Sequence, residues 1–315
     1  MTKALRNKVF NDNVPVMVSI CTITYNHSKF ITECIEGFLN QECDFRVEII
    51  IYDDASNDGT SNIIKEYADS HPTIIRPILL NENQYSKGVN PYYSYVFPIT
   101  KGAYIAICDG DDYWNDPAKL SRQVSILEAE HNTAITYGPV HAFNEEGTVE
   151  SYRGGACRNL SPNELKLGPP INTLTVCFRN IFKDALPPLF LRNSPVGDLT
   201  VWAMLGYHGG GRYIADMPPA NYRIHQGGIL SLIPRRKSYF MAAMTYLSIA
   251  AYHSENNDNS SAQLCLKNAT GMVNRKLLAR FDDVDINDTS FRAKVRQWNR
   301  RRKLRRETKK MRRKK

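Results

Sequence analysis

The stretch GAYIAICDGDDYWNDPAKLSRQ, residues 102–123, joins an apolar run to a cluster of acids. Residues 103–108 are almost continuously apolar, which is typical of a strand covered on both faces of a sheet. Three carboxylates follow at once, Asp109, Asp111 and Asp112, and no Lys or Arg lies within six positions of them. The stretch therefore predicts a buried strand whose carboxyl end carries a polar site.

The same pattern extends through the first half of the chain. Three more apolar runs, at residues 16–24, 47–52 and 74–80, are separated by amphipathic helical stripes. A further helix is predicted to begin near Pro117, because Pro is tolerated at a first helical position, and to continue through Leu127. Alternating strands and helices predict βαβ units with right-handed crossovers, and hence an α/β fold with a mainly parallel sheet.

Polar residues follow three of these predicted strands. Thr24 and Tyr25 end the first, Asp53 and Asp54 end the second, and residues 109–112 end the fourth. Ligands of open parallel sheets bind at the carboxyl ends of the strands. We therefore expect these side chains to share one rim of the sheet.

The acidic turn at 109–112 favours a bound cation. Clustered carboxylates raise one another's pKa unless a cation lies among them. Hard oxygen ligands prefer Mg²⁺ or Mn²⁺, and Mg²⁺ completes its shell with water and substrate phosphates. A solvated acidic turn remains an alternative, since a D-x-D triplet alone is weak evidence. A calcium loop that starts at Asp54 is excluded, because Lys65 stands where a bidentate Glu is required.

The composition is that of an ordinary globular protein. The chain has 315 residues, of which 42% are hydrophobic and 23% charged, enough for a sizeable core. No apolar run reaches membrane-spanning length and the first ten residues lack the apolar core of a signal peptide, which predicts a cytoplasmic location. The seven cysteines are widely spaced without a CxxC pair, so we expect reduced thiols and no zinc site.

Five segments, taken in order, resemble the family 2 glycosyltransferases, nucleotide-sugar enzymes of the GT-A fold. They are VSICTITYN (18–26), IIIYDDASNDGT (49–60), the stretch at 102–123, VGDLTVW (196–202) and NYRIHQGG (221–228). The resemblance implies a GT-A, Rossmann-like nucleotide-binding fold, which a helical C-terminal part and a basic tail follow. The predicted division is a donor-binding half (1–145), an acceptor-side half of the same domain (146–232), a helical region (233–290) and the tail (291–315).

The resemblance implies a set of nucleotide-binding residues on the donor side. Tyr25 is expected to pack near the base and Asp54, with Asp53 beside it, to hydrogen-bond the base. Asp109, Asp111 and Asp112 match the D-x-D region, which handles the ribose and the metal-bound diphosphate. The full set is Thr24, Tyr25, Asp53, Asp54, Asp109 and Asp111.

The resemblance also implies a metal site and a catalytic base. The ligands of Mn²⁺ or Mg²⁺ are expected to be Asp111, Asp112 and His225, and which acid is the main ligand stays open. Asp198 matches the general base of inverting members, since a carboxylate in reach can take the acceptor's proton. Asp198 as a helix N-cap, and His225 as a hydrogen-bonded core residue, are the structural alternatives. His27 could contact phosphate or the donor sugar, but a solvated surface position is favoured.

Together these assignments predict a metal-dependent, inverting glycosyltransferase with a UDP- or dTDP-sugar donor. Its acceptor would be a hydroxyl of a glycan or lipid-linked glycan, in the biosynthesis of bacterial surface polysaccharide or lipopolysaccharide. Retention of configuration stays open, because inversion depends on Asp198. A sugar-nucleotide nucleotidyltransferase is the alternative enzyme, but the segment TYNHSKF (24–30) lacks the Gly-rich, Arg-containing loop of that class.

The net charge of +9 belongs to the end of the chain. Residues 292–315 hold 15 Lys/Arg and one acid, whereas the rest holds 26 basic and 31 acidic residues. Such a segment can attract an anionic membrane surface or nucleic-acid phosphates, or can remain solvated. Peripheral membrane association is favoured because many acceptors of the family are lipid-linked. A nucleic-acid-binding protein is disfavoured because the remaining body is net acidic.

Overall fold

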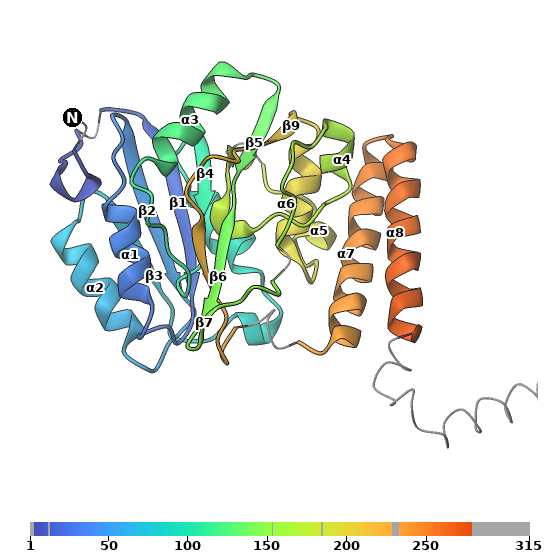
Figure 1. Cartoon of the computed structure of the whole chain (residues 1–315), viewed down its shortest axis with the longest axis horizontal. Helices are drawn as coiled ribbons and strands as arrows, with labels where there is room; N and C mark the ends of the chain where they lie inside the picture. Colours follow the sequence, from blue (N-terminus) through green and yellow to red (C-terminus); the bar gives the residue numbers. More distant parts are fainter. Residues whose placement is uncertain (1–2, 12, 153, 184, 229–232, 279–315) are drawn as a thin grey trace, which may run out of the picture.

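A computed structural model describes residues 3–11, 13–152, 154–183, 185–228 and 233–278 (Figure 1). The basic tail predicted at 291–315 lies outside these residues. Among the helices in the described ranges, none combines the length and the hydropathy that a bilayer crossing requires.

In the described part of the chain, the central sheet has seven strands in the order β3-β2-β1-β4-β8-β5-β9. Their bounds are β1 Val16–Thr24, β2 Arg46–Asp53, β3 Ile75–Leu79, β4 Tyr104–Ile107, β5 Thr133–Tyr137, β8 Cys177–Arg179 and β9 Gly210–Tyr213. Every neighbouring pair is parallel except the two that involve β8. The predicted α/β fold with a mainly parallel sheet is confirmed.

Helices cover both faces of this sheet (Figure 1). Ile49 and Ile51 of β2 belong to a core shared with α1, α2 and α3, while Ile50 and Tyr52 belong to a second core shared with α6 and α7. This alternation explains why β2 is apolar throughout. The helices are α1 Ile31–Leu39, α2 Thr60–Ser70, α3 Lys119–Ala129, α4 Pro162–Lys166, α5 Leu189–Arg192, α6 Gly197–Leu205, α7 Arg235–Glu255 and α8 Asn259–Leu278.

A second, small sheet has the order β10-β6-β7. Strand β10 (Ala220–Arg223) is parallel to β6 (Val140–Asn144), which is antiparallel to β7 (Gly147–Thr148). The loop after β4 is tied to this sheet, because Tyr113 and Asn221 exchange backbone hydrogen bonds of 3.2 and 2.9 Å. The acidic turn at 109–112 therefore lies between the two sheets.

Most expected elements in the first half are present, with small shifts. β1 has the predicted bounds, but the helix expected near Pro117 begins at Lys119. Oδ1 of Asp116 accepts a hydrogen bond from the Ala118 N–H at 3.0 Å, which holds a turn ahead of the helix. The predicted helical region contains α7 and α8.

Three strands of the central sheet, β5, β8 and β9, lie outside the four predicted apolar runs. β8 is inserted antiparallel between β4 and β5, and comes from the predicted acceptor-side half. The central sheet thus continues across the boundary predicted at residue 145, and that boundary stays a prediction.

Candidate functional site

Strand register brings the predicted rim residues to one edge of the sheet. Thr24 at the end of β1 pairs with Asp53 at the end of β2, and Cys21 pairs with Ile107 near the end of β4. The loop after β4 passes very close to β1: a Cβ added at Gly110 would lie 2.8 Å from Oγ1 of Thr24. Glycine at this position lets the acidic turn approach β1.

The two acids at the end of β2 are buried and bonded to the protein. Asp53 accepts hydrogen bonds from the hydroxyls of Ser56 and Ser61. Oδ1 of Asp54 accepts from the Gln84 N–H at 2.8 Å and from a tyrosine hydroxyl, and its Oδ2 accepts from the Tyr85 N–H at 3.0 Å. Both carboxylates therefore hold loops at the edge of the sheet.

The first acid after β4 has a single side-chain donor among the described residues. The Tyr92 hydroxyl donates to Oδ1 of Asp109 at 2.6 Å. Burial, together with the charge of Asp111, raises the pKa of Asp109 to about 7. Tyr92 lies in a π-helical turn, Tyr92–Val96. A carboxyl with this pKa changes its charge near neutral pH.

Asp112 faces the second sheet. Its Oδ1 accepts from the Arg223 N–H at 2.8 Å, and the Arg223 guanidinium donates to the carbonyl of Asp111 at 2.9 Å. The guanidinium also binds Glu33 of α1 and lies 4.6 Å from the Phe30 ring centre. Burial, and then the Asp111 charge, raises the pKa of Asp112 well above its usual range.

Asp111 lies against two histidines. Nε2 of His225 is 3.0 Å from Oδ2 of Asp111, and Nε2 of His27 is 3.9 Å from the same oxygen. One ligand atom from each residue lies within 4.8 Å of the other two. Burial raises the pKa of Asp111, but the His225 hydrogen bond and the His27 charge outweigh it and lower that pKa.

This group can hold a divalent cation. Burial lowers the pKa of His27 more than the Asp111 charge raises it, which favours the neutral ring that binds metals. Nδ1 of His27 is buried with no hydrogen-bond partner in the described ranges. Two imidazoles and a carboxylate form an open donor set for a transition-metal dication. We call His27, Asp111 and His225 the histidine–aspartate group.

The group differs from the ligand set predicted from the sequence. Asp111 and His225 are present, but the Asp112 carboxylate turns to the Arg223 amide, and His27 is the third member. His27 is half-buried, so its predicted place on the solvated surface is wrong. Its position two residues after Tyr25 in the predicted rim was the available signal. His225 is hydrogen-bonded to Asp111 at the edge of the sheet, a contact that agrees both with a metal ligand and with the structural alternative.

Asp198 lies in the first turn of α6. The helix begins at Gly197 with Val196 as its N-cap, so the alternative of Asp198 as N-cap is wrong. Burial raises the pKa of Asp198, partly opposed by the Leu199 N–H. Its charge also contributes to the raised pKa of Asp109, so the two carboxylates interact electrostatically.

The remaining predicted rim residues differ in exposure. Tyr25 is 44% exposed, which leaves its ring free to stack on a ligand. The side chain of Thr24 is 1% exposed, and its carbonyl accepts from the Asp54 N–H at 3.0 Å. A nucleotide contact by the Thr24 side chain stays a prediction that its burial does not favour.

A parallel sheet with clustered acids and a candidate cation site at its carboxyl edge is the arrangement expected of α/β proteins that bind a ligand outside the ends of their strands. The family model of Glycosyl transferase family 2 matches residues 19–186, more than half of the chain. The chain belongs to glycosyl transferase family 2, and the predicted family and its enzyme class are confirmed.

Two relatives show how far the similarity extends. The uncharacterized protein Rv1520 of Mycobacterium tuberculosis (strain ATCC 25618 / H37Rv) is 37% identical over 216 residues, which are 67% of this chain and 60% of the relative. The UDP-Glc:alpha-D-GlcNAc-diphosphoundecaprenol beta-1,3-glucosyltransferase WfaP of Escherichia coli is 38% identical over 114 residues, 36% of this chain and 42% of that enzyme. The match thus spans about 60% of the length of the mycobacterial relative.

Solved structures share the fold. TarS 1-349 of S. aureus in complex with UDP-GlcNAc has a TM-score of 0.58 at 16% identity, over 82% of this chain and 72% of that chain. The mannosyltransferase PcManGT of Pyrobaculum calidifontis, in complex with GDP-Man and Mn²⁺, has a TM-score of 0.50 at 15% identity, over 93% and 84% of the two chains. The predicted fold class is confirmed by this likeness.

Proposed function

We propose that this protein transfers a sugar from a nucleoside diphosphate sugar to a hydroxyl acceptor, with inversion at the anomeric carbon. The observation that carries the proposal is the histidine–aspartate group, which lies at the carboxyl edge of the sheet beside two carboxyls of raised pKa. Uncompensated acids at this edge favour a cation and, through it, a diphosphate.

We assign the donor side to the ends of β1, β2 and β4. Tyr25 is exposed and suited to pack on the base, and Asp109 is placed for the ribose or diphosphate side. Asp54 stays the predicted base contact, although both its oxygens already accept protein hydrogen bonds. His27, Asp111 and His225 would hold Mn²⁺ or Mg²⁺, and the two imidazoles favour Mn²⁺. A bound cation would stabilise the charge that develops on the leaving diphosphate.

We assign the general base to Asp198. Its pKa is raised by burial, which makes the carboxylate a stronger base than an exposed one. Its place in the first turn of α6 puts it on a different element from the cation ligands. One carboxylate can therefore take the acceptor's proton while others hold the donor.

The substrates are proposed from the family and its members. UDP or dTDP sugars are favoured as donors, and a glycan or lipid-linked glycan of a bacterial surface polymer as acceptor. Support comes from TarS, which was solved with UDP-GlcNAc, and from WfaP, which is named for a diphosphoundecaprenol acceptor. A cytoplasmic location, peripheral membrane contact through 292–315 and the absence of nucleic-acid binding stay predictions.

The nucleotidyltransferase alternative loses its basis. The family match begins at residue 19 and includes both acidic strand ends, so the same acids belong to a glycosyltransferase pattern. The loop after β1 also presents His27 in place of a Gly-rich segment.

The first test is calorimetric titration of UDP, dTDP and GDP into the full chain, with and without Mn²⁺. One nucleotide should bind tightly only with Mn²⁺, and Asp111→Asn should weaken that binding about 100-fold, because it removes a charged ligand. Asp69→Asn, at an exposed carboxylate of α2, is the matched control and should leave binding unchanged. If none of the three nucleotides binds with Mn²⁺ present, the donor site is wrong.

The second test separates catalysis from donor binding. With water as acceptor, slow hydrolysis of the UDP-sugar that binds is followed by UDP release. Asp198→Asn should lower this rate about 10²- to 10⁴-fold while calorimetric donor affinity is retained. The exposed Asp216→Asn is the control. Equal hydrolysis rates for Asp198→Asn and the native protein would refute the assignment of Asp198 as the general base. NMR of the anomeric configuration of the product would test inversion.

A further inference from the structure

The hairpin of α7 and α8 exposes an apolar stripe. On α7 the stripe contains Phe240, Met244 and Leu247, spaced by four and three residues, and on α8 it contains Leu266 and Val273, spaced by seven. Each of the five side chains is 41–47% exposed. Such spacings place residues on one face of a helix. We call these five residues the hairpin stripe.

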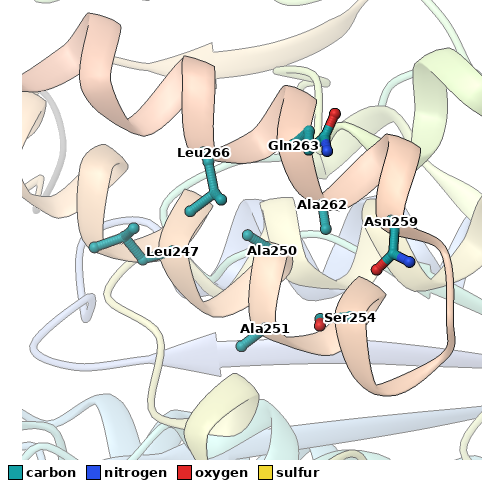
Figure 2. Close-up of a pocket in the computed structure, with 8 residues that line it drawn as sticks. All are labelled: Leu247, Ala250, Ala251, Ser254, Asn259, Ala262, Gln263 and Leu266. Carbon is teal, nitrogen blue, oxygen red and sulfur yellow. The ribbon is translucent and has the colours of Figure 1, made fainter.

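The stripe is continuous across the two helices. Leu247 and Leu266 line the same groove, and its walls are completed by small or polar residues, Ala250, Ala251, Ser254, Asn259, Ala262 and Gln263 (Figure 2). The helices are joined by only three residues, 256–258, and run antiparallel (Figure 1). Counted from these two leucines, Phe240 and Val273 each lie seven residues, about two helical turns, toward the open end of the hairpin.

The opposite side of α7 is already used. Tyr246 and Ile249 belong to the core that α7 shares with the sheet, and Cys265 and Ala269 of α8 extend the same core. The five residues of the hairpin stripe lie outside this core and are exposed apolar surface.

Charge indicates the kind of partner. Residues 235–315 hold 22 Lys/Arg and seven Asp/Glu, whereas residues 1–234 hold 19 and 25. Within the hairpin the acids are Glu255 and Asp258, at its closed end, and Asp258 is paired with Lys166 at 2.8 Å. Helix α8 has no acid, and α7 begins with three consecutive basic residues. The open end of the hairpin, from which the chain leads to the basic tail, is thus positive.

We propose that the hairpin stripe lies against the surface of an anionic lipid bilayer. Helices that lie in a membrane interface typically have an apolar face bordered by Lys and Arg. A bilayer of anionic lipids carries the charge opposite to that of these basic residues. In a two-fold symmetric contact between two copies of the chain, two positively charged faces would instead lie against each other. The bilayer contact is independent of the proposed transfer reaction and is tested without substrate.

Flotation of the full chain with large unilamellar vesicles tests the contact. One set contains phosphatidylglycerol and phosphatidylethanolamine, and the other only phosphatidylcholine. Leu266→Glu should lower the affinity for the anionic vesicles at least about tenfold, because it places a charge in the buried face. Leu264→Glu is the matched control: Leu264 lies on the same helix, is also 47% exposed, does not line the groove, and is about 200° around the helix from Leu266. It should bind as the native chain does.

Two results would overturn the proposal. If Leu266→Glu and Leu247→Glu bind anionic vesicles like the native chain, the basic tail alone provides the attraction and the stripe is not involved. If these variants instead convert a sedimenting dimer into a monomer, in buffer without lipid, a second copy covers the stripe. Circular dichroism checks the fold, and Leu266→Ser replaces the charged variant if it does not fold. Calorimetric nucleotide binding should stay native in every variant, so failure of this contact is distinct from failure of the donor site.

Discussion

The acids at the ends of β2 and β4 lie on the same edge of the sheet but have different surroundings. At β2, Asp54 accepts three hydrogen bonds from the protein and Asp53 accepts two from serines. At β4, Asp109 and Asp112 each have one close donor in the described part of the chain, and both have raised pKa values. Asp53 and Asp54 each have at least two hydrogen-bond donors, whereas Asp109 and Asp112 have one each among the described residues.

We propose that this difference separates structural acids from ligand-binding acids. A buried carboxylate with several donors stabilises the fold, and losing it leaves those donors unsatisfied. A carboxylate cluster short of donors destabilises the protein without a cation, and is retained where a ligand supplies the missing charge. Substitutions at the two strand ends should therefore change stability in opposite directions.

The largest expected effect is on cation binding at the β4 end. Asp111→Asn should lower Mn²⁺ affinity about 100-fold, since it removes the only carboxylate of the histidine–aspartate group. Without metal, Asp112→Asn should keep the free energy of unfolding equal to or above that of the native protein, because burial and the Asp111 charge disfavour the Asp112 carboxylate, and an asparagine oxygen can still accept from the Arg223 N–H. Mn²⁺ calorimetry and urea unfolding in EDTA measure the two quantities. A clear loss of metal-free stability would remove the distinction between the two ends.

At the β2 end, Asp54→Asn should lower the free energy of unfolding by about 2–3 kcal/mol. An asparagine keeps one acceptor oxygen but places an NH₂ group against the N–H of Gln84 or Tyr85, both now bonded to the carboxylate. Urea unfolding without ligand measures the loss apart from any effect on a nucleotide. Asp69→Asn on the exposed side of α2 should change stability by less than about 0.5 kcal/mol. If both variants behave alike, Asp54 is not a structural acid.

The sequence predicts the sheet better than it predicts the site. Continuous apolar runs and strand–helix alternation are local signals, so the parallel strands and the shared rim follow from them. Whether a carboxylate has donors depends on distant segments: the donors to Asp54 come from residues 84 and 85, and the donor to Asp112 comes from β10. His27 joins Asp111 and His225 only because the two sheets meet. Such encounters leave no periodic pattern in a single sequence.

A smaller effect is expected from Tyr92→Phe, which removes the side-chain donor to Asp109. Because the folded-state pKa of Asp109, about 7, is above the usual value, the native state holds a proton there, and stability falls as pH rises through 7. Loss of the Tyr92 hydroxyl destabilises the ionised carboxylate of Asp109. The variant should thus lose about 1 kcal/mol at pH 8 and less at pH 6. Urea unfolding in EDTA at pH 6 and pH 8 measures this loss of stability. An equal loss at the two pH values would refute the proposed effect of Tyr92 on the ionised Asp109.

The smallest effect is expected at Asp58. This acid is exposed, but like Asp53 and Asp54 it accepts several hydrogen bonds. Burial raises its pKa, but bonds from the Ser28 N–H at 3.0 Å and from the N–H and hydroxyl of Thr60 outweigh it and hold the pKa at about 2. Since the folded-state pKa is below the usual value, the stabilisation is present at neutral pH and is lost as pH falls from about 4 toward 2. Asp58→Ala should cost about 0.5–1 kcal/mol at pH 7, a value reduced by solvent screening, and almost nothing at pH 2. Urea unfolding at the two pH values decides it. A loss of stability that does not depend on pH would mean that Asp58 acts through packing. The number of hydrogen-bond donors alone would then not distinguish the structural acids at this edge of the sheet.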